Sequence, residues 1–413
     1  MNSLTVVFLS VVAIGVAIQI WLAQRQTHSI KTHQSTVPDA FAEKINLDSH
    51  QKAARYSLEK LGFGQKILIF ETILLLIWTV GGLLNWLDQT GQTLGWSQLW
   101  TGVAVLLSMS FVGTLLELPI DLYRTFKIEE KYGFNHTSLG LFFSDMFKGL
   151  LVGLVIGVPF LALILWLMES MGEFWWLYVW VVWMGFSLLM MWAYPTIIAP
   201  LFNKFEPLED GELKQQIVEL LERNGFASNG IFVMDGSKRS AHGNAYFTGL
   251  GSNKRIVFFD TLLRDLTNDE VVAVLAHEVG HFKRKHIQKR LISIFAFSLI
   301  GLALLGWLMQ QSWFFTGLGV EETSTYAALA LFSLVMPAFT FFMSPIMSWA
   351  SRKHEFEADD FAAEQSNPKH LIQALVKLYK ENANTLTPDA LYSAFYDSHP
   401  PAPVRVAHLM AKL

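Results

Sequence analysis

The run His277–His281, with the sequence HEVGH, has the clearest capacity for chemistry in this chain. Two histidines four residues apart project from one face of a helix, close enough to bind the same metal ion. The Glu that follows the first His lies beside that ion and can take a proton from a water molecule. The run therefore predicts a metal site with His277 and His281 as ligands and Glu278 as general base. His286 follows five residues after His281, so we expect it to point away from the metal face and to lie at the surface.

A catalytic zinc ion needs a third protein ligand and one open position. Because the chain has no cysteine, that ligand must be His, Asp or Glu. The metzincin pattern would continue with Gly at position 284 and His at position 287, but this chain has Arg284 and Ile287, which excludes that class. The other common solution is a carboxylate from a second helix.

Three carboxylates nearer the C-terminus are candidates for this role: Glu355, Glu357 and Asp359. Glu355 and Asp359 are four residues apart and share a helix face. One of them can bind the metal ion while the other accepts the free N–H of a ligating His and fixes its tautomer. Glu357 points elsewhere, where a solvated charge is its expected role. The spacing favours Glu355 over Glu357 as the ligand and leaves both open.

The tail of the chain adds a His that two prolines follow directly, at positions 400 and 401. A His held rigidly in this way can donate a hydrogen bond to the oxyanion of a tetrahedral intermediate. Arg405 can either hold the orientation of His399 or bind the anion itself. His399 and Arg405 are therefore predicted to be catalytic residues.

Long apolar runs must position these side chains. The chain has 413 residues, of which 52% are apolar and 16% charged, whereas about 25% of residues are charged in soluble proteins. A spanning helix needs roughly 20 apolar residues. The segments that meet this requirement are Leu4–Leu22, Ile67–Leu87, Leu99–Ile120, Gly149–Met168, Phe174–Ala193, Leu291–Met309 and Tyr326–Met347. The sequence therefore predicts a mainly α-helical membrane protein with seven spans, and its net charge of -4 gives no reason to expect a nucleic-acid partner.

The basic residues indicate the orientation of the spans. All 31 Lys and Arg lie in residues 24–66, in the loop between spans three and four, in residues 194–290 and in the tail from residue 348. The other loops and the N-terminus have none. Because Lys and Arg collect on the cytoplasmic side, we expect the N-terminus outside and the polar segments in the cytoplasm.

The spans also divide the chain. We expect spans one to five in 1–193, the metal helix in 194–290, spans six and seven in 291–347, and the third ligand in 348–413. The two polar segments, 194–290 and 348–413, are predicted to pack into a single cap.

Short β-prone runs in the first polar segment predict a small antiparallel meander. The runs are Ile231–Met234, Ala245–Thr248 and Arg255–Phe259, separated by turn residues at 235–236, 249 and 251–252.

Helix signals continue from there. Thr267 and Glu270 form a capping box that opens the metal helix, and no Pro or turn signal follows, so we expect that helix to run straight into span six. Span seven is predicted to continue through Ser351–Glu364 in the same way.

Several stretches of the chain resemble the type I CAAX prenyl proteases, which are integral-membrane zinc metalloproteases. The matching stretches are His277–His281, Ser351–Ala362, His399–Pro401, Leu118–Asn135, Ser237–Ser240 and Asn244–Phe247. The resemblance covers nearly the whole chain, including the seven spans, and it assigns no role to Leu118–Asn135.

This resemblance implies seven helices that form a barrel around a water-filled intramembrane chamber, beneath a cytoplasmic zincin-type cap. It implies one zinc ion per chain, with Glu355 as third ligand and Asp359 behind the ligands. Asn244 and Ala245 would pair with an extended peptide substrate by β-augmentation. His399 and Arg405 match the His and Arg that stabilise the transition state in that family.

The implied substrate is a C-terminal Cys-a-a-X peptide with an isoprenoid on its Cys, cleaved beside the lipid bilayer by a monomeric enzyme. The short loop Gln310–Thr325 and the absence of cysteine favour a bacterial inner membrane, with the endoplasmic reticulum membrane as the alternative. A bacterial host could instead use the enzyme for membrane-protein quality control, as HtpX-type proteases do.

Two further alternatives fit the sequence less well. A site-2-type intramembrane protease also uses an HExxH helix but needs an Asp in a later span, whereas Asp235 precedes the motif. A transporter or receptor would need charges along a pathway, and the few charges within the spans are Glu71, Glu117 and Asp121.

Overall fold

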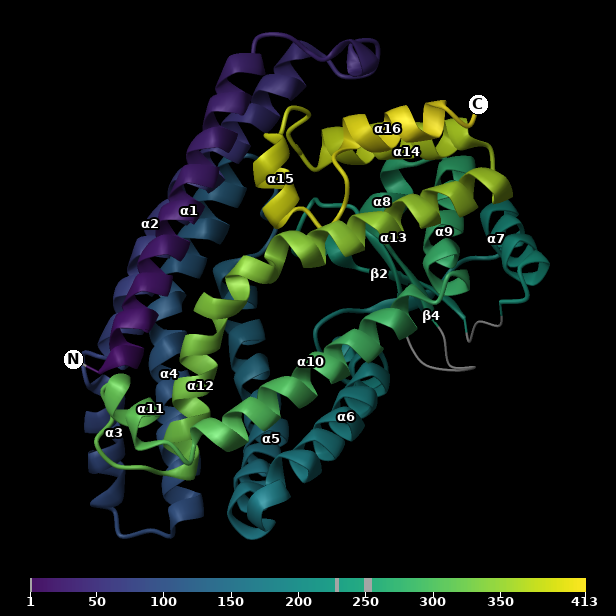
Figure 1. Ribbon diagram of the computed structural model, residues 1–413. Helices are drawn as coiled ribbons and strands as arrows, with labels where there is room; N and C mark the ends of the chain where they lie inside the picture. Colours follow the sequence, from purple (N-terminus) through teal and green to yellow (C-terminus); the bar gives the residue numbers. More distant parts are fainter. Residues whose placement is uncertain (1, 227–229, 249–254) are drawn as a thin grey trace.

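Long helices dominate the computed structural model, which describes residues 2–226, 230–248 and 255–413 (Figure 1). Seven helical stretches in these residues are long and apolar enough to cross a membrane. Their helices are α1 (Ser3–His33), α2 (Leu47–Trp78), α4 (Gln98–Tyr123), α5 (Leu139–Ser170), α6 (Trp175–Ala193), α10 (His286–Leu308) and α12 (Thr325–Thr340), the last continuing into α13 (Ser344–Gln365). The seven predicted spans are confirmed.

Two details of the spans differ from or extend the prediction. The second span ends at Trp78 instead of Leu87, because Thr79 leaves the helical conformation, with φ -95° and ψ -103°. Gly82, with a positive φ of 77°, then turns the chain before it continues as a helix. A separate short helix, α3 (Leu83–Gln92), follows. The seventh span continues as predicted, since a short 3₁₀ turn joins α12 to α13, which runs on to Gln365.

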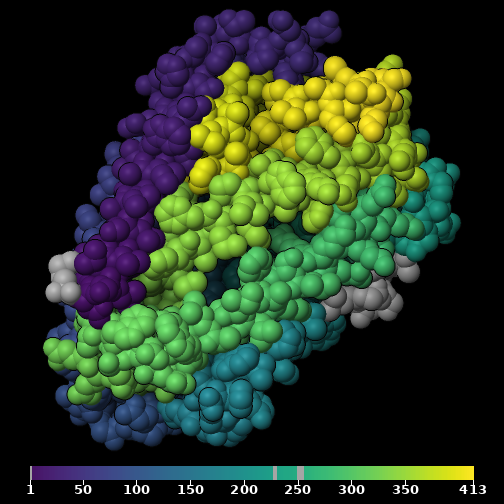
Figure 2. Space-filling view, viewed as in Figure 1, coloured from purple at the N-terminus to yellow at the C-terminus, as the bar shows by residue number. Residues whose placement is uncertain are grey.

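The spans are packed tightly at one end and lie apart in the middle. A hydrophobic cluster gathers the end of α1 near the N-terminus with α3, α11 (Ser312–Gly317) and the start of α12, and it includes Phe8, Leu84 and Tyr326. Figure 2 shows an opening between α10 and the α12–α13 stretch, farther along the same spans. An opening between these helices is what a barrel around a chamber would present on this face.

The segments 202–285 and 351–413 pack together at the other end into one unit, here called the cap. They share a single hydrophobic core whose buried members include Ile217, Phe258, Ala276, Leu375 and Val406. The helices that supply this core are α7 (Glu212–Arg223), α8 (Asp260–Asp265), α9 (Asn268–Lys283), α13, α14 (Pro368–Glu381) and α16 (Ala402–Met410). Short helix α15 (Ala390–Tyr396) connects the last two.

A small sheet lies in the cap beside α9. Among the described residues it has four strands in the order β1-β2-β4-β3, with bounds β1 Phe205–Pro207, β2 Ile231–Met234, β3 Ala245–Thr248 and β4 Arg255–Phe259. The three predicted strands are confirmed, whereas the meander is wrong because β2 and β4 are parallel neighbours. After β2 the chain skips the adjacent position in the sheet and forms β3 at the edge. Strand β4 then fills the position between β2 and β3. The predicted turn residues 249 and 251–252 lie outside the described residues.

The prediction of one continuous helix from the metal motif into span six is also wrong. Helix α9 ends at Lys283, and Lys285 has a positive φ of 57°, a conformation that interrupts a helix. Helix α10 then starts at His286. This turn redirects His286 and breaks the helical spacing from His281 on which its predicted surface position depended.

Candidate active site

Helix α9 carries the HEVGH run through the centre of the cap. The predicted capping box at its start is confirmed: Thr267 Oγ1 accepts a hydrogen bond from the Glu270 amide, and Glu270 accepts one from the Thr267 amide at 2.8 Å. Apolar side chains around the helix, such as Val271, Ala273 and Ala276, are buried in the core of the cap. This packing holds α9 in place and so fixes the direction in which His277 and His281 project.

Helix α13 crosses α9 at very close range and brings the carboxylates to the histidines. A Cβ atom on Gly280 would lie 3.0 Å from Ala358 Cα and 3.1 Å from the Ala358 carbonyl oxygen. Only a glycine allows the two backbones to approach so closely. Glu355 lies three residues before Ala358, and Asp359 directly follows it, so both carboxylates lie close to the crossing.

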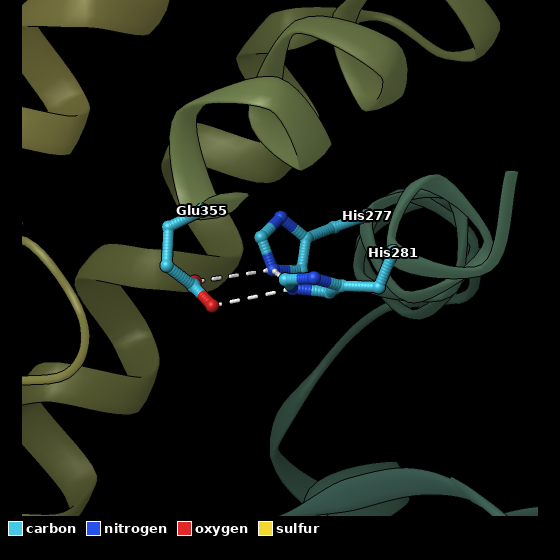
Figure 3. A group of neighbouring side chains, drawn as sticks. All are labelled: His277, His281 and Glu355. Carbon is cyan, nitrogen blue, oxygen red and sulfur yellow. Dashed lines mark hydrogen bonds and ion pairs between the residues drawn. The ribbon is translucent and has the colours of Figure 1, made fainter. Parts of the chain in front are cut away.

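Figure 3 shows His277 and His281 from α9 facing Glu355 from α13. The two Nε2 atoms lie 3.2 Å apart. His281 Nε2 is 3.2 Å from Glu355 Oε1, and His277 Nε2 is 3.4 Å from Glu355 Oε2. One ligand atom from each residue thus falls within 4.8 Å of the others. The structure brings Glu355, and not Glu357, to the two histidines.

The donor set fits a divalent metal ion. Glu355 is 4% exposed, and its Oε2 atom is buried without a hydrogen-bond donor among the residues described. A buried carboxylate oxygen without such a partner carries a substantial free-energy cost. A metal ion held by two imidazole nitrogens and this carboxylate would remove that cost.

Asp359 and Arg405 lie behind His277. Asp359 is fully buried, and its Oδ1 lies 2.8 Å from His277 Nδ1, the nitrogen that faces away from Glu355. Arg405 donates two hydrogen bonds to the Asp359 carboxylate, at 2.6 and 2.9 Å. Its Nη1 atom lies 3.8 Å from Glu355. The geometry thus places Arg405 against Asp359 and His277, with its Nη2 atom 3.2 Å from His277 Nδ1. The sequence had suggested that Arg405 orients His399 or binds the anion, and it gave no sign of these partners.

His286 is buried, so its predicted surface position is wrong. Its Nδ1 lies 3.0 Å from His281 Nδ1, and its Nε2 lies 2.9 Å from Glu357 Oε2. Its ring stacks on that of His354, with centroids 4.1 Å apart. Glu357 is accordingly not a purely solvated charge. The sequence offered one signal for this pair, the proximity of His286 to the motif, but no way to see the turn at Lys285.

Glu278 and His399 lie on the less enclosed side of the site. Glu278 is half-buried, and no hydrogen bond or ion pair engages its carboxylate within the described ranges. The His399 side chain is 63% exposed, and its Nε2 lies 3.4 Å from Glu355 Oε1. The two groups are therefore free to meet a bound molecule.

The surroundings of His399 and His277 shift the pKa values of these two side chains in opposite directions. Protein atoms around the His399 ring exclude part of the solvent despite its exposure, and this lowers its pKa, while the Glu355 carboxylate opposes the effect. Burial and Arg405 lower the pKa of His277, but its contacts with Asp359 and Glu355 outweigh them and raise it to about 9.

The Leu118–Asn135 stretch, which had no predicted role, holds the segment that leads into β3. Asn135 forms a β-bridge with Ser240, and the Phe134 ring stacks on His242 with centroids 4.4 Å apart. Glu129 Oε2 lies 3.6 Å from His242 Nε2. These contacts fix the chain just before Asn244.

Strand β3 presents a free edge next to α9. It pairs with β4 on one side and is the last strand of the sheet among the described residues. The Phe259 amide donates to the Asn244 carbonyl, so the alternating pattern of an antiparallel ladder turns the Ala245 N–H to the outer edge. That N–H donates to the Asn244 side-chain oxygen at 2.9 Å.

Comparisons with known proteins match both the membrane helices and the cap. Residues 26–204 match the family model described as CAAX prenyl protease N-terminal, five membrane helices, and residues 207–412 match peptidase family M48. A CAAX prenyl protease 1 homolog from Arabidopsis thaliana is 34% identical over 92% of this chain and 91% of its own length. The chain belongs to the CAAX prenyl protease 1 family.

Other relatives of this family agree. CAAX prenyl protease 1 from Saccharomyces cerevisiae is 37% identical over 73% of this chain and 70% of its own length. The crystal structure of S. mikatae Ste24p superimposes with a TM-score of 0.93 at 32% identity and covers 99% of both chains. The chain is thus a multi-pass membrane metallopeptidase of family M48, which excludes the site-2-type and transporter alternatives.

The close crossing of α9 and α13 yields a first prediction. Gly280→Ala should push the helices apart, because its nearest neighbours are backbone atoms of Ala358 that cannot move aside. Overpacking of this kind costs about 1–3 kcal/mol, which corresponds to a roughly 5- to 150-fold weaker metal Kd if the strain falls on the site. Competition with a chelator measures the affinity. Gly157→Ala on α5, where a Cβ would meet open space, is the control. Unchanged metal affinity in Gly280→Ala would show that the crossing distance does not matter to the site.

Proposed function

We propose that this protein is a zinc endopeptidase in which His277, His281 and Glu355 hold one zinc ion. The observation that carries the proposal is the convergence of one ligand atom from each residue within 4.8 Å. Two nitrogens and one carboxylate oxygen, with a fourth position left open, form the ligand set of catalytic zinc sites. The buried Oε2 of Glu355, which accepts no hydrogen bond among the described residues, supports the same assignment.

The surrounding residues have distinct roles in this proposal. Zinc would polarise the scissile carbonyl and lower the pKa of water to about 7. Glu278 takes the proton of the attacking water and later delivers it to the leaving amine. His399 donates a hydrogen bond to the developing oxyanion from the exposed side of the site. Asp359 and Arg405 hold the His277 ring in the tautomer that leaves Nε2 free.

The proposed substrate is a peptide that ends in Cys-a-a-X with an isoprenoid on the Cys. The relatives named above are CAAX prenyl proteases. The hollow between the spans supports such a substrate, because a lipid chain can stay in apolar surroundings while the peptide reaches the polar cap. The test is mass spectrometry of farnesylated Cys-a-a-X peptides incubated with purified protein. Loss of the last three residues is expected, and equal cleavage of the unprenylated peptide would favour a quality-control protease.

Strand β3 is the proposed docking edge for the substrate backbone, with Asn244 and Ala245 at its start. Ala245→Pro removes the outward N–H without removing a bond to β4, and proline is tolerated at the first residue of an edge strand. A substrate carbonyl left unpaired costs about 1–3 kcal/mol, so kcat/KM should fall roughly 5- to 150-fold. Ala245→Val keeps the N–H and serves as the control. Wild-type kcat/KM in folded Ala245→Pro would remove this edge from substrate binding.

The proposed orientation has the N-terminus outside and the cap in the cytoplasm, on the evidence of the basic loops. We propose that the enzyme acts as a monomer. The relatives named here are eukaryotic and give no support to the prediction of a bacterial inner membrane. Because the chain has no cysteine, a single cysteine at exposed Glu219 of the cap tests the orientation: an impermeant maleimide should reach it only after the membrane is opened.

A further inference from the structure

His286 and Glu357 form a hydrogen-bonded chain that ends on a proposed metal ligand. His286 Nδ1 faces His281 Nδ1 at 3.0 Å, and His286 Nε2 faces Glu357 Oε2 at 2.9 Å. His286 is 4% exposed, and the His354 ring covers one of its faces. Nothing in the metal site as described so far requires these two residues.

The Glu357 end sets the order of donors and acceptors along these three side chains. Glu357 is a carboxylate and can only accept, so the neutral His286 ring must carry its proton on Nε2. Nδ1 of His286 is then an acceptor. The proton between the two rings must therefore sit on His281 Nδ1, which leaves the His281 Nε2 lone pair bare. That Nε2 is the atom that faces Glu355 and His277.

We propose that Glu357 and His286 are positioning residues that hold His281 in its metal-binding tautomer. Loss of the carboxylate acceptor would let the His286 ring place its proton on Nδ1. Two N–H groups would then face each other at 3.0 Å, and His281 would have to rotate or carry its proton on the metal-facing nitrogen.

This arrangement gives each proposed ligand histidine its own partner from α13. Asp359 binds His277 Nδ1 directly, whereas Glu357 acts on His281 Nδ1 through the intervening His286. The turn at Lys285 makes the second arrangement possible, since it places the first residue of α10 beside the last turn of α9. Partners of metal-bound histidines typically contribute 10- to 100-fold to metal affinity or activity.

The test uses full-length purified protein and two readouts that do not depend on turnover: zinc affinity by chelator competition and the visible absorption spectrum of the cobalt(II)-loaded form. Glu357→Leu removes the acceptor, whereas the matched Glu357→Gln removes only the charge. Glu364→Leu, an exposed position two turns farther along α13, is the control. The Glu357–His286–His281 arrangement is here called the relay. Because Glu357 is partly exposed, its variants test the relay even where a change at the buried His286 unfolds the protein. His286→Asn, which can still offer an oxygen to His281 Nδ1, is compared with His286→Phe.

We expect Glu357→Leu and His286→Phe to weaken zinc binding about 10- to 100-fold and to shift the cobalt spectrum. Glu357→Gln, His286→Asn and the control should resemble the wild type. The relay is overturned if Glu357→Leu keeps the wild-type affinity and spectrum, or if Leu and Gln are equally impaired. The inference rests on the proposed metal site, but the two fail differently: a wild-type protein that binds no metal refutes the site itself.

Discussion

Glu278→Gln is expected to abolish peptide cleavage while the protein stays folded and keeps its metal ion. The carboxylate of Glu278 has no partner in the described ranges, so the variant breaks no hydrogen bond or ion pair. The amide cannot take a proton from water, and general acid–base catalysis by one side chain contributes about 10²–10⁴-fold. We therefore expect kcat to fall by several orders of magnitude, measured by mass spectrometry on a farnesylated peptide.

Elemental analysis of the same preparation distinguishes loss of the base from loss of the metal ion. Zinc content should equal that of the wild type, because Glu278 is not one of the converging residues. Asp269→Asn, which removes an exposed carboxylate from the first turn of the same helix, should leave both cleavage and zinc content unchanged. A metallated Glu278→Gln protein that cleaves at the wild-type rate would show that another group is the base.

Glu355→Gln is expected to lose the metal ion itself. Its carboxylate lies 3.2 Å and 3.4 Å from the two Nε2 atoms and is buried. A neutral amide oxygen is a weaker ligand than a carboxylate for a divalent ion. The loss of affinity should exceed the 10- to 100-fold that is typical of partners behind the ligands, and cleavage should fall with zinc occupancy.

Glu357→Gln is the matched comparison, two residues away on the same helix. It keeps an acceptor for His286, so zinc content and cleavage should stay close to wild type. The opposite pattern, with Glu355→Gln fully metallated and Glu357→Gln depleted, would make Glu357 the ligand and contradict the assignment.

Local patterns in the sequence predicted the elements of the fold well. Spans such as Leu99–Ile120 stand out because about 20 apolar residues in a row have few uses outside a bilayer. The capping box at Thr267 and the strand Ala245–Thr248 are also local signals, and the structure confirms both. The order of strands is not local, because it depends on where the segment before β3 is held.

In the metal helix, too, local spacing predicted only what lies within one helix. The spacing of His277 and His281 predicted a shared face because both belong to one helix. The same rule failed at His286, since the helix ends at Lys283 and the positive φ of Lys285 redirects the chain. No composition or spacing signal marks a lysine for that conformation.

The choice between Glu355 and Glu357 shows what only tertiary contact can decide. Their spacing favoured one without excluding the other, and the crossing of α13 over Gly280 settles which carboxylate faces the histidines. The partner of Arg405 could not be predicted either, since 46 residues separate it from Asp359.

The central claim is that His277, His281 and Glu355 surround one zinc ion. An anomalous difference map collected at the zinc absorption edge from crystals of the wild-type protein tests it most directly. We predict one peak per chain, about 2.0–2.2 Å from an Nε2 atom of each histidine and an oxygen of Glu355. A map without a peak between these residues, or with its zinc peak at another site, would contradict the claim.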